Sequence, residues 1–294
     1  PHFRHKRDCL LCLNYGKPVL CEKPLAMNAA EAKEIVSVAR NRGVFCMEAM
    51  WMRFMPLIKE TQGLIQLGKI GEVRMLKADF GYPTEFDPEN RFFNLALGGG
   101  SLLDRGGYPF SLAFRLMGIP TNVTGHACIG DTGVDEQSAI VFAYSDNKLA
   151  QLSTTLRTYA TNNATIIGTK GKITIHPPFC RPDKISITPL SENPIVSSSR
   201  PAINPSKFKR RAKAAIKNLP FASQALENFR DKTVTFSKAV KGNGFNYEAE
   251  EVIHCLKQNW VESPNMPLDE SIKMLEIMDE LRQSWGVQYP HDSH

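Results

Sequence analysis

The stretch Gly16-Lys17-Pro18-Val19-Leu20-Cys21-Glu22-Lys23-Pro24 decides how the front of this chain folds. Its apolar run at 19–21 is short and continuous, which is typical of a strand covered on both faces. Pro24 removes a backbone donor and restrains the residues before it, so the strand ends in a sharp turn. In doubly wound sheets, ligands lie beyond the carboxyl ends of the strands, where Lys23 would point. Glu-Lys-Pro by itself is also common in surface turns, so the tripeptide alone does not establish a site.

The residues around this stretch alternate between helices and strands. Apolar positions predict a helix over 6–15 that ends at Gly16. Asn28 can cap a second helix that runs to about Arg40 and is closed by Gly43, and a second buried strand follows at 44–47. This order predicts a doubly wound parallel sheet, although two strands are too few to make such a sheet stable alone.

After Trp51 the pattern changes to strands in which apolar and polar residues alternate. One polar face on many of these strands indicates an antiparallel sheet that is open to solvent or to a partner on one side. Helices are predicted over 56–67 and about 101–117. The predicted strands lie at 73–80, 123–129, 139–143, 149–159, 164–167 and 173–175, with a hairpin turn at 168–171.

The last third of the chain is less regular. Residues 189–245 contain several prolines and a serine run, which predicts a long surface insertion. Two helices follow, one over about 247–258 and one that Asp269 caps and that ends near Trp285. The chain is thus predicted to be an α/β protein. A truncated doubly wound segment at 1–50 precedes an α+β domain at 51–294, which has a large, mostly antiparallel open sheet and an insertion at 191–243.

Composition limits the classes of function. The chain has 294 residues, 42% hydrophobic and 22% charged, with a net charge of +6, as in an ordinary soluble protein with no need for a nucleic-acid partner. The basic segment 207–217 is interpreted as a solvated helix face rather than a site for an anionic partner. Seven cysteines without a regular framework predict a reducing compartment, the cytoplasm. No apolar run approaches the ~18–20 residues needed to span a membrane, so no membrane partner is expected.

A second candidate site lies at Gly98-Gly99-Gly100-Ser101-Leu102-Leu103-Asp104-Arg105-Gly106-Gly107-Tyr108. Glycines before a helix expose backbone N–H groups to a ligand. Asp104 and Tyr108 are four positions apart, so both lie on one helical face. A carboxylate and a phenol at this spacing are weak on their own, and an ordinary helix after a glycine-rich loop is the alternative. The sequence contains no G-x-G-x-x-G fingerprint.

His2, His5, Cys9 and Cys12 repeat at helical spacing and resemble a metal site. Because Cys9-x-x-Cys12 has no second pair and sits in an apolar helix, core packing is the favoured interpretation, and no metal is predicted.

These pieces together resemble the Gfo/Idh/MocA family of NAD(P)-dependent oxidoreductases, and most closely its dihydrodiol and D-xylose dehydrogenase branch. The resemblance covers nearly the whole chain except the insertion. The segments that carry it most clearly are G-K-P-V-L-C-E-K-P-L-A (16–26), M-E-A-M-W-M-R-F (47–54), F-N-L-A-L-G-G-G-S-L-L-D-R-G-G-Y-P (93–109), T-G-V-D-E-Q (132–137) and W-G-V-Q-Y-P (285–290).

The resemblance implies a Rossmann segment followed by a domain whose open sheet often forms a homodimer. It implies catalytic roles for Lys23 and Tyr108, with Asp104 as the carboxylate of the same motif. Tyr108 would be the general acid/base on the hydroxyl of a sugar or a trans-dihydrodiol, and Lys23 would bring the pKa of this phenol toward neutrality. The implied cofactor is NADP or NAD, with NADP favoured. The residues implied to lie near the cofactor are Pro1, His2, His5, Glu22, Lys23 and Pro24, and those near the substrate pocket are Trp51, Arg53 and Phe80.

Two departures from the family pattern are visible. Arg105 and Gly107 stand where relatives usually carry apolar residues, which is expected to put a cation beside Asp104 and to loosen the helix before Tyr108. The match also begins at the end of the family's fourth sheet strand, so roughly 60–80 residues with the phosphate loop are expected to be missing. A partner-binding member without chemistry, or an inactive or incomplete fragment, is therefore the alternative to an enzyme.

Overall fold

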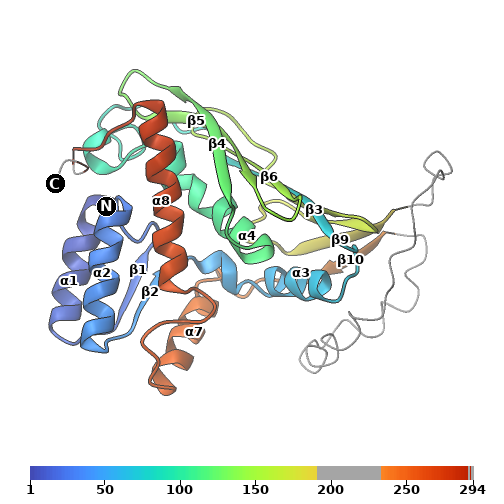
Figure 1. Cartoon of the computed structure of the whole chain (residues 1–294), viewed down its shortest axis with the longest axis horizontal. Coiled ribbons are helices and arrows are strands. Elements are labelled where there is room, and N and C mark those ends of the chain that lie inside the picture. The colour runs from blue at the N-terminus through green and yellow to red at the C-terminus, as the bar shows by residue number, and fades with distance from the viewer. Residues whose placement is uncertain (191–232, 291, 293–294) are drawn as a thin grey trace.

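The computed structural model describes residues 1–190, 233–290 and 292, and they form two sheets of very different size. A parallel pair of strands, β1 (Val19–Glu22) and β2 (Cys46–Ala49), belongs to the first fifty residues. An eight-stranded sheet lies beyond it in the chain. Figure 1 shows the small sheet with its helices at one end of the molecule and the large sheet rising away from it. The predicted fold class is confirmed.

The small sheet is built as the sequence indicates. The strands pair in register from Val19 opposite Cys46 to Glu22 opposite Ala49. Helices α1 (His5–Asn14) and α2 (Ala29–Arg42) pack against each other beside them. The predicted cap is confirmed, since the Asn28 side chain accepts a hydrogen bond from the Glu31 N–H at 2.9 Å. Gly43, at φ +64°, ends α2 in the left-handed conformation that glycine adopts readily.

The large sheet has the strand order β10-β9-β8-β7-β3-β6-β5-β4, and every neighbouring pair is antiparallel except β3 and β6. Along β5 and β8 buried and less buried residues alternate, as in a sheet with one covered face. Figure 1 shows the covering helices α3 (Pro56–Gln66), α4 (Gly107–Met117) and α8 (Leu268–Trp285) on one side of the sheet. The strands are β3 (Val73–Gly81), β4 (Asn122–Ile129), β5 (Asp135–Ala143), β6 (Leu149–Thr155), β7 (Ala164–Gly168), β8 (Gly171–Ile175), β9 (Lys184–Pro189) and β10 (Val234–Ser237).

Several sequence predictions need correction. The helix predicted over 101–117 begins as a π-helical turn, η4 (Leu102–Gly106), and only then continues as α4. Asp269 does not cap α8: the cap position is Pro267, and Asp269 lies in the first turn, where its carboxylate pairs with Arg40 at 2.9 Å. The strand predicted over 149–159 ends at Thr155. Cys9 is buried as predicted, but Cys12 is exposed.

Part of the predicted surface insertion is an edge strand of the sheet, because β10 lies within 191–243 and pairs antiparallel with β9, which precedes it. Both strands were missed, because their alternation is short and the prolines nearby suggested irregular chain. Residues 191–232, which include the basic segment 207–217, lie outside the described residues. Helix α7 (Asn246–Lys257) then follows close to its predicted position. The division of the chain at residue 50 stays a prediction.

Helix α8 connects the two parts. It packs against α2 and β2 on one side and against α4 and β4 on the other. The buried Arg282 guanidinium pairs with Asp279 and with Asp292, each at 2.6 Å, and Asp279 also accepts the Ala29 N–H at the start of α2. These contacts fix the small sheet against the large one. Within the part of the chain that the structure describes, no helix combines the length and apolarity that crossing a membrane requires.

Candidate active site

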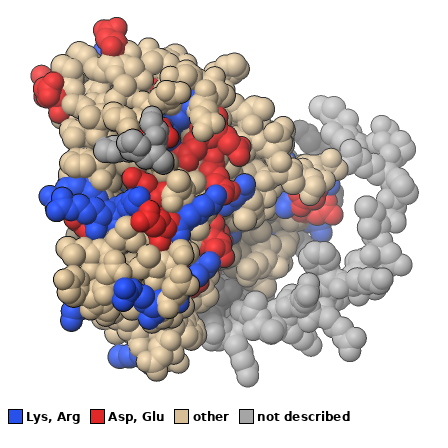
Figure 2. Space-filling view, turned by 60° about the vertical axis from the view of Figure 1, so that its left-hand side comes forward, with Lys and Arg blue, Asp and Glu red and all other residues tan. Residues whose placement is uncertain are grey.

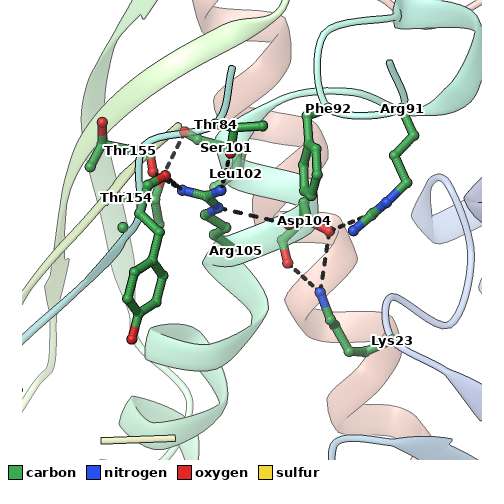
Figure 3. A network of polar contacts seen from close by, with 12 residues as sticks. Lys23, Thr84, Arg91, Phe92, Ser101, Leu102, Asp104, Arg105, Thr154 and Thr155 are labelled. Carbon is green, nitrogen blue, oxygen red and sulfur yellow. Dashed lines mark hydrogen bonds and ion pairs between the residues drawn. The ribbon is translucent and has the colours of Figure 1, made fainter. Parts of the chain in front are cut away.

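Lys23 and Asp104 meet where the two parts of the molecule join. Lys23 follows β1. Asp104 lies in the π-helical turn η4, which comes directly after the glycine segment (98–101). The Lys23 ammonium donates to the backbone carbonyl of Asp104 and lies 3.4 Å from its carboxylate oxygen Oδ1. Figure 3 shows this ammonium pointing at Asp104 from below. Both side chains are nearly buried, so their charges are shielded little by water.

Asp104 gathers further cationic and polar groups. Arg91, from the segment between β3 and η3 (Leu95–Leu97), donates to Oδ1 at 2.9 Å and stacks on the neighbouring ring of Phe92. The His2 ring lies 3.9 Å from the same oxygen. Burial by itself would raise the pKa of Asp104, but the charges of Lys23 and Arg91 outweigh it and lower that pKa. Asp104 is thus held as a carboxylate. Arg91 was missed in the sequence because nothing in its surroundings marks it.

Arg105 turns away from the cluster. Its guanidinium donates to the backbone carbonyls of Tyr82 and Thr155 and to the Thr84 hydroxyl, and only its Nε comes within 3.9 Å of Asp104 Oδ2. Figure 3 shows it on the side of Asp104 opposite Lys23. The expected cation beside Asp104 is present, but its main contacts tie the segment after β3 to the sheet.

Tyr108 lies one helical turn after Asp104, and its side chain packs against aromatic residues. Its hydroxyl accepts a hydrogen bond from the Trp51 indole N–H at 3.2 Å, and its ring lies 4.9 Å, centroid to centroid, from that of Phe80. The Lys23 ammonium sits over the ring face, 4.9 Å from the centroid. Burial raises the pKa of Tyr108 well above its ordinary value. In this structure the residue is therefore a phenol, and the effect expected from Lys23 on its pKa is not seen.

A buried carboxylate positions the glycine segment. Asp135, at the start of β5, accepts hydrogen bonds through Oδ2 from the Ser101 hydroxyl at 2.8 Å and from the Leu102 N–H at 2.7 Å. Gly100 has φ +120°, and a Cβ built there would lie 2.3 Å from Asp135 Oδ1. Only glycine lets the chain approach this carboxylate, and the approach fixes where η4 begins. In the sequence, Asp135 stands out only as part of the matching segment 132–137.

The remaining predicted residues divide into two groups. His5 lies next to the residues around Lys23, because its Nδ1 is 2.7 Å from the Pro24 carbonyl oxygen. Pro24 itself is buried. Burial lowers the pKa of His2 to about 4, so that ring is neutral near pH 7. Pro1 and Glu22 are exposed. Arg53 is not brought to the cluster: its guanidinium is fully buried against Ser111 and Glu270.

Charges of both signs cover the adjoining surface. Figure 2 shows Lys and Arg side chains interleaved with Asp and Glu on the face that carries the first helices and α8. Ion pairs on α2 account for part of this pattern: Lys33 lies 2.7 Å from Glu276, and Arg40 lies 2.9 Å from Glu262. Such a face offers no continuous basic patch for nucleic acid. Among the described residues, no group of histidine, cysteine and acidic side chains could hold a metal ion.

The comparisons with known proteins agree with this geometry. Residues 1–50 match the oxidoreductase family with an NAD-binding Rossmann fold, and residues 58–174 match the GFO/IDH/MocA C-terminal domain. The trans-1,2-dihydrobenzene-1,2-diol dehydrogenase of Xenopus tropicalis is 36% identical over 291 residues, which are 98% of this chain and 77% of that protein.

The chain belongs to the Gfo/Idh/MocA family of oxidoreductases. This is a family of NAD(P)-dependent dehydrogenases. Two solved structures share its fold. An aldose-aldose oxidoreductase from Caulobacter crescentus, complexed with glycerol, superposes with a TM-score of 0.75 at 19% identity over 97% of this chain and 74% of that one. A levoglucosan dehydrogenase complexed with NADH and levoglucosan gives 0.74 at 17% identity, over 97% and 76%.

His2 and the glycine segment meet where the two parts of the molecule join. The neutral His2 ring lies against the Gly98 carbonyl at 3.3 Å, and a Cβ on Gly98 would lie 2.5 Å from the Met27 sulfur. The glycine segment is therefore packed directly onto the carboxyl end of the small sheet, where doubly wound folds bind dinucleotides. A glycine-rich fingerprint for the phosphates does not occur in the sequence.

Proposed function

We propose that this chain carries the active site of an NADP-preferring dehydrogenase that acts on a hydroxyl group of a trans-dihydrodiol or a sugar such as D-xylose. The observation that carries the proposal is the position of the Lys23 ammonium, against the Asp104 carboxylate and 4.9 Å above the Tyr108 ring. The identity to a trans-dihydrodiol dehydrogenase favours the diol, and the sugar ligands of the structural neighbours favour the sugar.

Tyr108 is the proposed proton-transfer residue. Its hydroxyl oxygen accepts a hydrogen bond from Trp51, and its ring packs on Phe80, so both neighbours orient the phenol and keep water from it. Because burial raises its pKa, Tyr108 keeps its proton near pH 7, which is the form that donates to a carbonyl oxygen. In the oxidative direction the same oxygen must first lose that proton, so alkaline pH favours oxidation.

Lys23 and Asp104 are proposed to stabilise negative charge that develops at the reacting oxygen. The ammonium is fixed by the Asp104 carbonyl and carboxylate, so it needs little reorganisation during the reaction. Arg91 shares the carboxylate and keeps it ionised. NAD(P), when bound, supplies the hydride acceptor or donor at its nicotinamide ring.

A homodimer through the uncovered face of the large sheet is proposed as the assembly. On neighbouring strands β5 and β6, Val141 and Leu149 are exposed and lie diagonally next to each other. Exposed apolar residues on adjacent strands offer a surface that a second copy can bury. Sedimentation of the purified chain tests this, with a dimer expected.

The first experiment titrates NADPH and NADH into the purified chain and follows cofactor fluorescence, with circular dichroism as the check on folding. Saturable binding, tighter for NADPH, is expected. A folded chain that binds neither cofactor would contradict the proposal. That outcome would favour a partner-binding protein without chemistry, the second candidate.

A further inference from the structure

A small cavity is lined in part by Lys23. Its volume is about 10 Å³, and its polar lining consists of Lys23, Glu48 and Ser271. The rest of its lining is apolar and comes mainly from α8, η4 and α4. These residues are Pro24, Met50, Leu103, Gly107, Met274, Leu275 and Met278. One water molecule needs about 10–15 Å³ and two or more polar partners. The cavity is close to this size, and it supplies three polar side chains.

Glu48 is a buried carboxyl group that the proposed chemistry does not use. It lies on β2, opposite Cys21 in the parallel register, so it neighbours the strand end that carries Lys23. The residue is 3% exposed. Its Oε1 accepts the Leu25 N–H at 3.1 Å, while its Oε2 is buried without a partner. Burial raises the pKa of Glu48, and nearby Ser271, Arg53 and Lys23 counteract this only in part.

Ser271 faces the same cavity from the first turn of α8. Its hydroxyl is buried and, like Glu48 Oε2, has no hydrogen-bond partner. The hydroxyl is close enough to lower the pKa of Glu48, yet it makes no direct bond to the carboxyl. A buried polar atom without a partner costs ~1–3 kcal/mol, and two such atoms around one cavity point to a shared ligand.

We propose that this cavity is a binding site for one water molecule, and that Glu48, acting through this water, is a positioning residue for the Lys23 ammonium. The water would bridge Glu48 Oε2 and Ser271 Oγ and present its remaining hydrogen-bonding capacity to Lys23. The Lys23 ammonium has three N–H donors. Two of them donate to the Asp104 carbonyl and carboxylate, which leaves one for the water. A metal ion does not fit here, because the Lys23 charge would repel it.

The arrangement gives Lys23 support from two sides. Asp104 holds the ammonium from the large-sheet side, and Glu48 with its water holds it from β2 and α8. This inference rests on the proposed function only for its kinetic consequence. The water site and the placement of Lys23 are properties of the folded chain.

The structural test is a high-resolution crystal structure of the chain and of two variants, Glu48→Gln and Ser271→Ala. The wild type is expected to show one ordered water within hydrogen-bond distance of Glu48 Oε2 and Ser271 Oγ. In Ser271→Ala the water is lost or displaced, and in both variants Lys23 Nζ moves away from its position beside Asp104. A well-resolved cavity without a water overturns the site, and an unmoved ammonium in both variants overturns the positioning role.

The kinetic test compares the same variants with Glu60→Gln. Glu60, on α3, is also a carboxyl whose pKa is raised by burial and whose Oε1 lacks a partner, but it does not line this cavity. Glu48→Gln is expected to lower kcat about tenfold, as for loss of a hydrogen bond to a charged group, with KM changed less than about twofold. Glu60→Gln leaves kcat unchanged.

The outcomes separate this inference from the proposed function. A purely structural Glu48 would lower thermal stability and leave the kcat of the folded enzyme intact, which contradicts the positioning role. A wild type that shows the water but turns over no substrate contradicts the proposed function. In that case the positions of Lys23 in the variant crystals alone decide the positioning role.

Discussion

The two sheets of this molecule differ in how completely they cover their apolar side chains. The eight-stranded sheet carries helices on one face, where Phe142 is inaccessible. In the small part, β2 is buried throughout, and its Met47 belongs to the same apolar cluster as Phe142. Other apolar residues of the small part stay exposed: Leu11 by 56%, Tyr15 by 76% and Leu20 by 40%. Since two strands do not hold together alone in water, packing against the rest of the molecule contributes to the order of the small sheet.

The docking surface is also where the candidate chemistry lies. α8 supplies the buried Arg282 pairs that hold α2, and next to this helix Lys23 of the small sheet meets Asp104 and Tyr108 of the large part. Each part brings one half of the site. Disturbing the docking should therefore also disturb the site, whereas a change confined to Tyr108 should leave the docking intact.

The largest effect is expected for Tyr108→Phe, which removes the oxygen proposed to transfer the proton and leaves the fold of both parts intact. Turnover should fall about a thousandfold, because a positioned acid or base contributes ~10²–10⁴. Initial rates of NADPH formation give the measurement. Tyr144→Phe is the control, since Tyr144 is another buried tyrosine but has an unpaired hydroxyl and lies directly after β5, away from the site. Equal rates for the two variants would remove Tyr108 from the mechanism.

The next effect is expected for Arg282→Met, which breaks the docking of the small sheet. Asp279 and Asp292 lose their buried cation, so the free energy of unfolding should fall by ~3–5 kcal/mol. Hydrogen exchange should accelerate more in α2 than in β5. The matched control is Arg40→Met, whose ion pairs are partly exposed and are worth ~1 kcal/mol or less. Uniform acceleration across both sheets would refute separate docking.

Asp135→Asn tests the buried carboxylate of the large part. Burial raises the pKa of Asp135 from 3.8 to about 6. Ionising this carboxyl therefore destabilises the folded state. This penalty is zero below about pH 4, where Asp135 is protonated in both states, and reaches its full size above about pH 6. This corresponds to about 3 kcal/mol. The wild type should therefore become less stable as the pH rises from about 4 to about 6. The amide side chain of the variant stays neutral, so the variant should not show this decrease. Urea unfolding of both proteins at several pH values measures it, and parallel profiles would contradict the raised pKa.

The smallest effects on stability are expected at the two open surfaces. Leu20→Lys places a charge on β1, which pairs only with β2 among the described strands, and should reduce aggregation. Val141→Lys places a charge on the uncovered face of the large sheet and should weaken the proposed dimer. Each should change the free energy of unfolding by ~0.5 kcal/mol or less. Light scattering and sedimentation distinguish the two effects, and a dimer lost only in Leu20→Lys would move the interface to the small sheet.

The sequence predicts most of the fold, because its signals are local. Asn28 and Gly43 mark the ends of α2 through capping and a positive φ, and alternation marks most strands of the large sheet. Lys23, Asp104 and Tyr108 were selected from motifs, and the structure brings them together. Arg91 and Asp135 escaped notice because their roles depend on contacts between segments far apart in the chain. The raised pKa of Tyr108 also depends on tertiary burial.

The central claim is that one dehydrogenase site forms where the two parts join. The most direct measurement follows NADP⁺ reduction by absorbance at 340 nm with trans-1,2-dihydrobenzene-1,2-diol and with D-xylose, using the folded wild-type chain. Turnover with at least one substrate is expected, rising toward alkaline pH as Tyr108 loses its proton. No reduction of NADP⁺ or NAD⁺ by a folded chain that binds the cofactor would contradict it.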